Sequence, residues 1–247
     1  MEHFLLFVLV GFVAQLIDGI LGMAYGVSAT SFLLSLGIAP AVASASVHAA
    51  EVVTTGFSGL AHLRFGNVDR TIVRRLLIPG VIGAVVGAYV LISIPGDALK
   101  PWIAGYLFLM GVVILSKAVT FKKSVGEEKH HHLVPLGFAG GFLDAIGGGG
   151  WGPIVTGTLV ARGNSPRFTI GSVNMAEFFV TAAASATFIA TIGLSYWEAI
   201  AGLALGGAVA APIAAWATSR VPARPLLVLV GLTVVALSAR TIWLALR

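Results

Sequence analysis

The chain has 247 residues, of which 57% are hydrophobic and 10% charged, and its mean hydropathy is +0.98. Soluble domains carry about 25% charged residues, so this composition excludes an ordinary soluble globular protein. The 31 glycines follow no collagen-like period and suit helices that pack closely inside a bilayer. The lack of cysteine excludes disulfide bonds and thiolate chemistry. We therefore expect an all-α, polytopic membrane protein.

Apolar segments of about 20 residues, the length that spans a bilayer, recur along the chain. Six are interpreted as transmembrane helices: 40–63, 72–94, 101–118, 167–190, 197–218 and 225–246. Two further apolar stretches, 4–37 and 133–163, are interrupted by glycine-rich segments. Most of their limbs run to about 10–13 residues, which is too short for a ~30 Å hydrocarbon core. Each stretch is therefore predicted to form a re-entrant helical hairpin.

The distribution of positive charge favours two hairpins over two broken single spans. Because hairpins return the chain to the side it left, they place 12 of the 15 Lys and Arg residues on one side and 3 on the other. The larger group, assigned to the cytoplasm, is Arg64, Arg70, Arg74, Arg75, Lys117, Lys122, Lys123, Lys129, Arg162, Arg167, Arg220 and Arg224. The smaller group is Lys100, Arg240 and Arg247. Both termini are predicted to lie outside.

An offset of 126 residues aligns the chain with itself. The aligned pairs are Asp18 with Asp144, Gly22 with Gly148, Gly26 with Gly152, Pro40 with Pro166, and segment 46–51 with segment 172–177. Each unit is a hairpin plus three crossings, so the chain changes side an odd number of times and the halves must be inverted. The predicted organisation is a first repeat over 1–120, a cytoplasmic linker over 121–132 and a second, inverted repeat over 133–247.

Four acidic residues fall at membrane depth, as two pairs related by the repeat: Asp18 with Asp144, and Glu51 with Glu177. An intramembrane carboxylate costs several kcal/mol unless it is neutral, paired or hydrated, so each is a candidate proton-coupling group. Two alternatives stay open. The aspartates are either protonatable sites or caps that accept N–H bonds from the glycine-rich turns. The glutamates are either proton carriers or uncharged, inert links between helices.

The glutamates lie on polar helix faces. Helical spacing puts His48 and Glu51 on one face near the middle of the membrane, and Asn174 and Glu177 at the equivalent places in the second half. The cavity between the halves is therefore expected to be polar.

The glycine-rich interruptions at 22–26 and 148–152 resemble anion-binding turns, because glycine lets backbone N–H groups crowd together at a helix N-terminus. Their glycines alternatively serve only to turn the chain and pack helices. The candidate substrate-binding residues are Gly22, Tyr25, Gly26, His48, Gly149, Gly150, Trp151 and Asn174. No lysine followed by Ser or Thr accompanies these turns, so a nucleotide-binding loop is not expected, and no cofactor is assigned. The run His130–His132 could bind a metal adventitiously, but we interpret it as a solvated loop and assign no metal site.

The paired glycine-rich tips, Pro40 and Pro166, and the segments 46–51 and 172–177 together resemble the TauE/SafE sulfite exporter family over almost the whole chain. The resemblance implies a bacterial inner-membrane transporter of sulfite, sulfoacetate or related organosulfur anions. The first tip departs from the glycine-proline pattern of the second, with Val27 at the position of Pro153. Equal substrate roles for the two tips are therefore not expected.

The predicted function is a secondary transporter of sulfur oxyanions, with export as the implied direction and the substrate held at the midplane between the tips. The alternatives are a passive anion channel and a carrier of another small anion. No zinc-protease or serine-nucleophile motif occurs, so an enzyme is not expected. The expected partners are a small anion and the lipid bilayer of the bacterial cytoplasmic membrane, with no nucleic acid; a homodimer is left open.

Overall fold

The computed structural model describes residues 2–120, 132–217, 220 and 222–245, and its regular elements are all helices. The first half contains α1 (Glu2–Leu21), α2 (Tyr25–Ser35), α3 (Pro40–Arg64), α4 (Arg70–Ser93) and α5 (Gly96–Thr120). The second half contains α6 (Leu133–Gly147), the π-helical turn η1 (Gly152–Thr156), α7 (Gly157–Ala161), α8 (Pro166–Thr191), α9 (Trp197–Ala217) and α10 (Ala223–Ala245). The predicted linker and the run His130–His132 fall outside the described residues except for His132. The division into 1–120, 121–132 and 133–247 stays a prediction.

Local sequence explains several helix starts. Pro40 and Pro166 are the first residues of α3 and α8, where the missing N–H of proline costs nothing. Asp69 caps α4, because its carboxylate accepts a hydrogen bond from the backbone N–H of Thr71 at 2.7 Å.

Six of the described helices are long and apolar enough to span a membrane: α1, α4, α5, α8, α9 and α10. This confirms an all-α, multi-pass membrane protein. Five of the six coincide with predicted crossings. The sixth is α1, predicted as a hairpin limb, whose apolar segment Phe4–Leu21 has 18 residues. Helix α3 was also predicted to cross the membrane and is 25 residues long. It is not among the six, and polar side chains such as His48 and Glu51 interrupt its apolar sequence.

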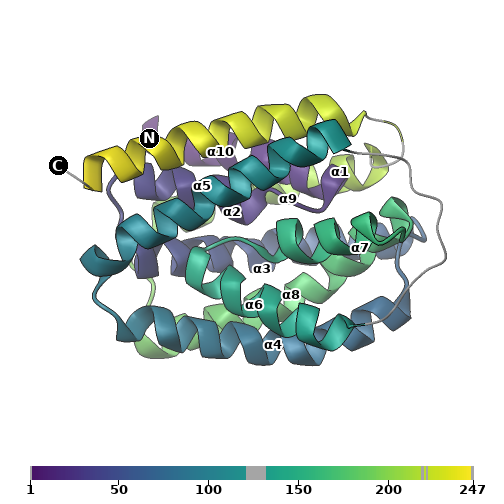
Figure 1. The fold of residues 1–247 in the computed structure, drawn as a ribbon, viewed down its shortest axis with the longest axis horizontal. Helices are drawn as coiled ribbons and strands as arrows, with labels where there is room; N and C mark the ends of the chain where they lie inside the picture. The colour runs from purple at the N-terminus through teal and green to yellow at the C-terminus, as the bar shows by residue number, and fades with distance from the viewer. Residues whose placement is uncertain (1, 121–131, 218–219, 221, 246–247) are drawn as a thin grey trace.

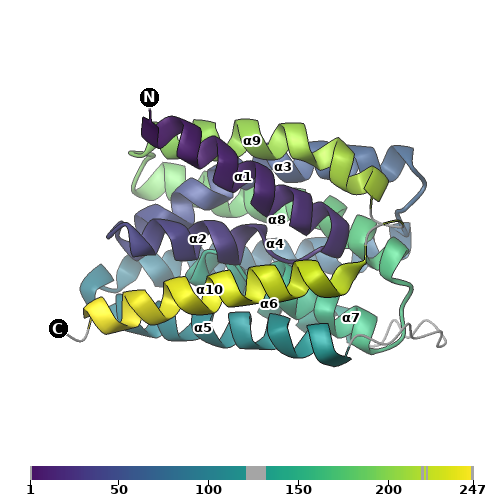
Figure 2. The same cartoon turned by 90° about the horizontal axis from the view of Figure 1, so that it is seen from above.

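The two interrupted stretches each turn back towards the end of the bundle from which they came. In Figure 2, α1 runs inward from the end where the chain begins, and α2 runs back towards that end. Arg240, near the end of α10, donates a hydrogen bond to the carbonyl of Ser35 at the end of α2. At the opposite end, Arg167 at the start of α8 donates to Asn67 and to the Phe65 carbonyl, which follow α3. Whether the hairpins re-enter a bilayer stays a prediction.

The pairs of helices that pack together in one half-to-half contact have equivalents, under the 126-residue offset, in a second contact. Helix α1 packs along α9, and α4 packs along α6; under the offset α1 corresponds to α6, and α9 to α4. Helix α3 packs on α8 and α5 on α10, so these equivalent helices contact each other directly. Such a pattern is expected of two related halves and supports the inverted repeat, which remains a prediction.

Glycines allow the closest of these helix contacts. A Cβ atom built on Gly141 of α6 would lie 3.0 Å from the carbonyl carbon of Gly80 on α4. One built on Gly206 of α9 would lie 2.7 Å from the backbone nitrogen of Phe12 on α1. Close backbone approach at small residues is how membrane helices gain packing energy where lipid removes the hydrophobic drive to associate.

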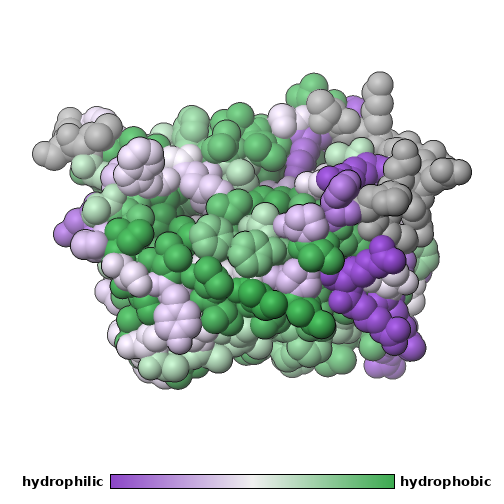
Figure 3. Space-filling model, turned by 60° about the horizontal axis from the view of Figure 1, so that its bottom comes forward, coloured by the Kyte–Doolittle hydropathy of each residue, from purple (hydrophilic) through white to green (hydrophobic). Residues whose placement is uncertain are grey.

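The outer surface suits a lipid environment. Figure 3 shows a broad hydrophobic area across one face, with hydrophilic residues gathered towards one end of the bundle. Large apolar side chains such as Trp102, Ile78 and Leu109 are more than half exposed. In a bilayer these side chains contact lipid tails, which is why the composition exceeds that of a soluble protein in apolar residues.

The sidedness of the termini gives the first testable prediction. Helix α1 begins and α10 ends at the same end of the bundle (Figure 1), and the charge distribution assigns that end to the outside. Alkaline phosphatase, which is active only outside the cytoplasm, should be active when fused after Arg247. Green fluorescent protein should fluoresce when inserted in the 121–131 linker. A C-terminal fusion that reports the cytoplasm would contradict the inverted-repeat topology.

Candidate functional site

The two glycine-rich tips contact each other through their backbones inside the bundle. A Cβ atom on Gly26 would lie 2.7 Å from the Cα atom of Gly149 and 3.2 Å from the carbonyl oxygen of Gly148. A Cβ atom on Gly152 would lie 2.5 Å from the carbonyl oxygen of Gly22. The offset aligns Gly26 with Gly152 and Gly22 with Gly148, so the same contact is made twice. Any larger residue at Gly26 or Gly152 would push the tips apart.

Each tip is held by the aspartate that precedes it. Asp18 Oδ1 accepts hydrogen bonds from the backbone N–H groups of Ala24 at 2.9 Å and Tyr25 at 3.3 Å. Asp144 Oδ1 accepts one from the N–H of Trp151 at 3.0 Å. These bonds satisfy donors at the starts of the helices that follow. Both aspartates therefore act as caps in this structure, and their role as proton sites stays a prediction.

A pair of threonines distinguishes the two tips. Thr30 Oγ1 donates a hydrogen bond to the carbonyl oxygen of Gly148, across from one half to the other. Its repeat counterpart, Thr156, lies beside Gly22: a Cβ atom on that glycine would be 3.1 Å from Thr156 Oγ1. The Thr156 hydroxyl is buried and has no hydrogen-bond partner among the described residues. The two threonines occupy equivalent positions in the two halves, but only Thr30 makes a hydrogen bond to the opposite tip in this conformation.

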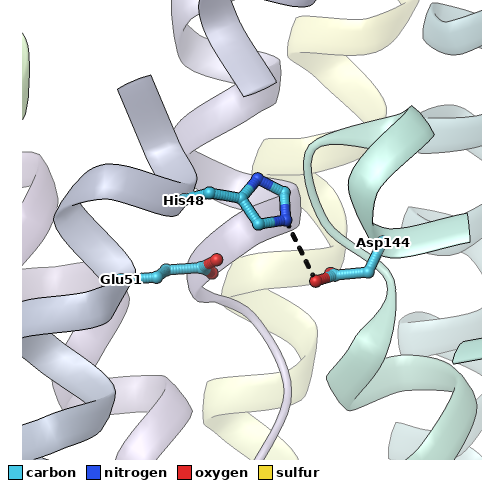
Figure 4. A group of neighbouring side chains, drawn as sticks. All are labelled: His48, Glu51 and Asp144. Carbon is cyan, nitrogen blue, oxygen red and sulfur yellow. Dashed lines mark hydrogen bonds and ion pairs between the residues drawn. The ribbon is translucent and has the colours of Figure 1, made fainter. Parts of the chain in front are cut away.

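His48, Glu51 and Asp144 converge beside the tips (Figure 4). His48 Nε2 lies 3.2 Å from Asp144 Oδ2, which joins α3 of the first half to α6 of the second. Glu51 Oε1 faces the first tip, 3.0 Å from a Cβ atom built on Gly26, whereas Glu51 Oε2 has no hydrogen-bond partner among the residues that the structure describes. All three side chains are at most 1% exposed by residue. Sequence reasoning placed His48 and Glu51 together; the structure adds Asp144.

The equivalent face of the second half is also buried, with Glu177 6% exposed, and two of its polar side chains already have partners. Asn174 Oδ1 accepts a hydrogen bond from Ser58 Oγ at 2.8 Å, and Asn174 Nδ2 donates to the carbonyl of Ile170 at 3.1 Å. The Trp151 indole N–H donates to the carbonyl of Val173 at 3.3 Å. Asn174 and Trp151, both predicted to bind substrate, are therefore engaged within the protein in this conformation.

The backbone donors predicted at the second tip are partly engaged as well. The N–H of Gly149 donates to the Asp144 carbonyl at 3.1 Å, and that of Trp151 to the Asp144 carboxylate. The N–H of Tyr25 at the first tip is likewise taken by Asp18. These three N–H groups are therefore not free to bind an anion in this conformation.

Tyr106 of α5 is a site residue that sequence reasoning missed. Its ring packs against Gly147, and its hydroxyl occupies the space where a Cβ atom on Gly150 would be. The hydroxyls of Tyr106 and Tyr25 are both buried without a hydrogen-bond partner in the described chain. Tyr106 stands in a uniformly apolar segment, so composition could not single it out.

The predicted cytoplasmic end of the second hairpin is lined by positive charge. Lys117 Nζ donates to the carbonyl oxygen of Pro153 at 2.7 Å, within the π-helical turn η1. A cavity of ≈ 490 Å³ opens here, lined by Lys117, Pro153 and Arg162 together with apolar side chains. Its volume and cations suit a small anion approaching the tip.

The family of the chain follows from comparison with known proteins. A family model described as "Sulfite exporter TauE/SafE" matches residues 7–241. The chain belongs to this family. A curated relative from Bacillus subtilis (strain 168), "Probable membrane transporter protein YtnM", is 46% identical over 256 aligned residues, which cover 99% of this chain and 85% of the relative. No solved structure matches the chain. The resemblance noted in the sequence is confirmed, and the chain is a multi-pass membrane transport protein.

The two threonines give a matched pair of substitutions. Thr30→Val removes the donor to the buried Gly148 carbonyl and should lower the free energy of unfolding by about 1–3 kcal/mol. Thr156→Val replaces an unpartnered hydroxyl with a methyl group of similar size and should leave stability unchanged or slightly higher. Thermal unfolding of both purified variants in the same detergent measures the difference. Equal losses in the two variants would show that the tips are not held as described.

Proposed function

We propose that the protein is a secondary transporter that carries a small sulfur oxyanion, such as sulfite or a sulfoacetate-like sulfonate, between its two glycine-rich tips. The observation that carries the proposal is a set of buried hydroxyls around the tips that have no hydrogen-bond partner within the described part of the chain: Tyr25, Tyr106 and Thr156. Most buried polar groups in proteins have a hydrogen-bond partner, so such a cluster calls for one. An oxyanion accepts several hydrogen bonds and supplies that partner.

The surrounding electrostatics favour an anion at this place. Helix α2 and the helical segment that begins at Trp151 both start at the tips, so the positive ends of their dipoles lie there. Lys117 and Arg162 line the cavity at one end of the second hairpin and provide an approach for negative charge. The family description names sulfite, which supports a sulfur oxyanion as cargo and export as the direction.

The buried carboxylates supply a means of coupling. Those of Asp18, Glu51, Asp144 and Glu177 are close enough to interact electrostatically. An anion that enters among ionised carboxylates is repelled, whereas protonation removes that repulsion. Anion and proton binding therefore reinforce each other.

Counterflow tests the transport proposal directly. Proteoliposomes loaded with unlabelled sulfite should transiently accumulate labelled sulfite against its gradient, and the initial rate should saturate with concentration. Equilibration without accumulation would instead identify a passive anion channel. Accumulation of phosphate or another anion in place of sulfite would identify a different cargo.

Tyr106→Phe tests the proposed donors. Removing one hydrogen bond to a charged ligand should weaken sulfite binding by roughly 10-fold or more, and the unpartnered hydroxyl leaves no bond within the protein to lose. Tyr89→Phe is the matched control, because Tyr89 is 51% exposed on the outer face of α4. Half-saturation of counterflow measures the effect. Identical values in the two variants would remove Tyr106 from the anion site.

Glu177→Gln tests the coupling. The wild-type sulfite flux should rise as the pH falls, because protonation of the carboxylates relieves repulsion. Glutamine fixes one of the four groups in a neutral form, so the flux should depend less on pH. Glu198→Gln, at an exposed position in the first turn of α9, should keep the wild-type profile. An unchanged profile in Glu177→Gln would make this carboxyl a structural link only.

A further inference from the structure

The cluster of His48, Glu51 and Asp144 has the composition of a metal site. One ligating atom from each side chain can be chosen such that all three atoms lie within 4.8 Å of one another. The residues come from both halves of the chain, and their side chains point towards a common centre (Figure 4). The chain spacing gave no sign of this cluster, because 96 residues separate His48 from Asp144.

The contacts of His48 show which of its two ring nitrogens is directed towards Asp144. Nδ1 lies 2.8 Å from the Ser44 carbonyl oxygen, which can only accept. Ser44 Oγ is 3.3 Å from the same nitrogen but donates its own proton to the Ala145 carbonyl. Nδ1 therefore donates to that carbonyl, and Nε2 is the ring nitrogen that faces Asp144 Oδ2. Metal-binding histidines are commonly oriented in this way, with the other ring N–H held by a carbonyl.

His48 Nε2 and Asp144 Oδ2 also have the spacing of two ligands of one metal ion. Nε2 and Oδ2 are 3.2 Å apart, and the ligand atoms of a tetrahedral zinc ion with bonds of about 2.0–2.1 Å are about 3.3 Å apart. Glu51 Oε2 is buried without a partner and can close on the same centre by rotation of its side chain. A divalent ion would also balance the charge of the two carboxylates.

We propose that His48, Glu51 and Asp144 bind one divalent transition-metal ion of the zinc class and so join α3 to α6. One imidazole and two carboxylates favour such an ion over calcium or magnesium, which prefer oxygen ligands alone. The second half has Asn174 in place of His48 and cannot build the same site. The stoichiometry is therefore one ion per chain. With the ion bound, the charges of Glu51 and Asp144 are balanced, and Asp18 and Glu177 are the two buried carboxylates of the described chain that are left to take up a proton.

Zinc binding to the purified protein tests the site. His130, His131 and His132 are first replaced by serine, because that run can bind metal by itself. Equilibrium dialysis of this protein against Zn²⁺, without any transported anion, should give one zinc per chain, and Ca²⁺ at the same concentration should give none. X-ray absorption should show zinc bonded to nitrogen and oxygen at about 2.0–2.1 Å. Less than one zinc per chain overturns the proposal.

Variants in the same serine background locate the ion. His48→Gln and Glu51→Gln should each weaken zinc binding by about 100-fold or more, since each removes a ligand. His62→Gln is the control: His62 is buried on the same helix, but it contacts Gly19 and Asn67 instead. Equal affinities in His48→Gln and His62→Gln overturn the proposal. Glu51→Gln decides the question if His48→Gln does not fold, because the Oε2 atom has no partner to lose.

Discussion

The two glycine-rich tips meet through their backbones inside the bundle, and this contact positions the polar groups of the site. Gly26 approaches Gly149, and Gly152 approaches Gly22, closely enough that a side chain on Gly26, Gly149 or Gly152 would separate the hairpins. The contact brings two helix N-termini and their capping aspartates together inside an apolar bundle. It also brings Asp144 of the second half within 3.2 Å of His48 of the first.

Holding the tips together also decides which groups are available to a ligand. The aspartates take up backbone donors at the tips, and Asn174 and the Trp151 indole are engaged within the protein. The buried hydroxyls of Tyr25 and Tyr106 remain. Thr30 is bonded across the tip contact whereas Thr156 is not, so the two halves occupy different local states. Transport by alternating access requires two halves that can exchange such states.

Much of the fold could be predicted because apolar length, interrupted segments and an internal repeat are properties of the sequence itself. The all-α, multi-pass architecture and the family follow from them. The length of α1 was harder to predict. Most limbs of the two interrupted stretches are about 10–13 residues long, whereas the apolar segment of α1 has 18 residues. Two aspects of the site could not be predicted. Tyr106 has no polar neighbours in sequence, and the pairing of Asp144 with His48 is a contact between halves that no local spacing encodes.

A structure of the protein determined by electron cryo-microscopy in lipid nanodiscs with saturating sulfite is the most direct test of the anion site. We predict sulfite density between segments 22–26 and 148–152, within about 3.5 Å of the Tyr25 or Tyr106 hydroxyl. We also predict that Gly26 and Gly149 separate to admit the anion. Sulfite bound elsewhere, with the two tips still in contact, would contradict the proposed anion site.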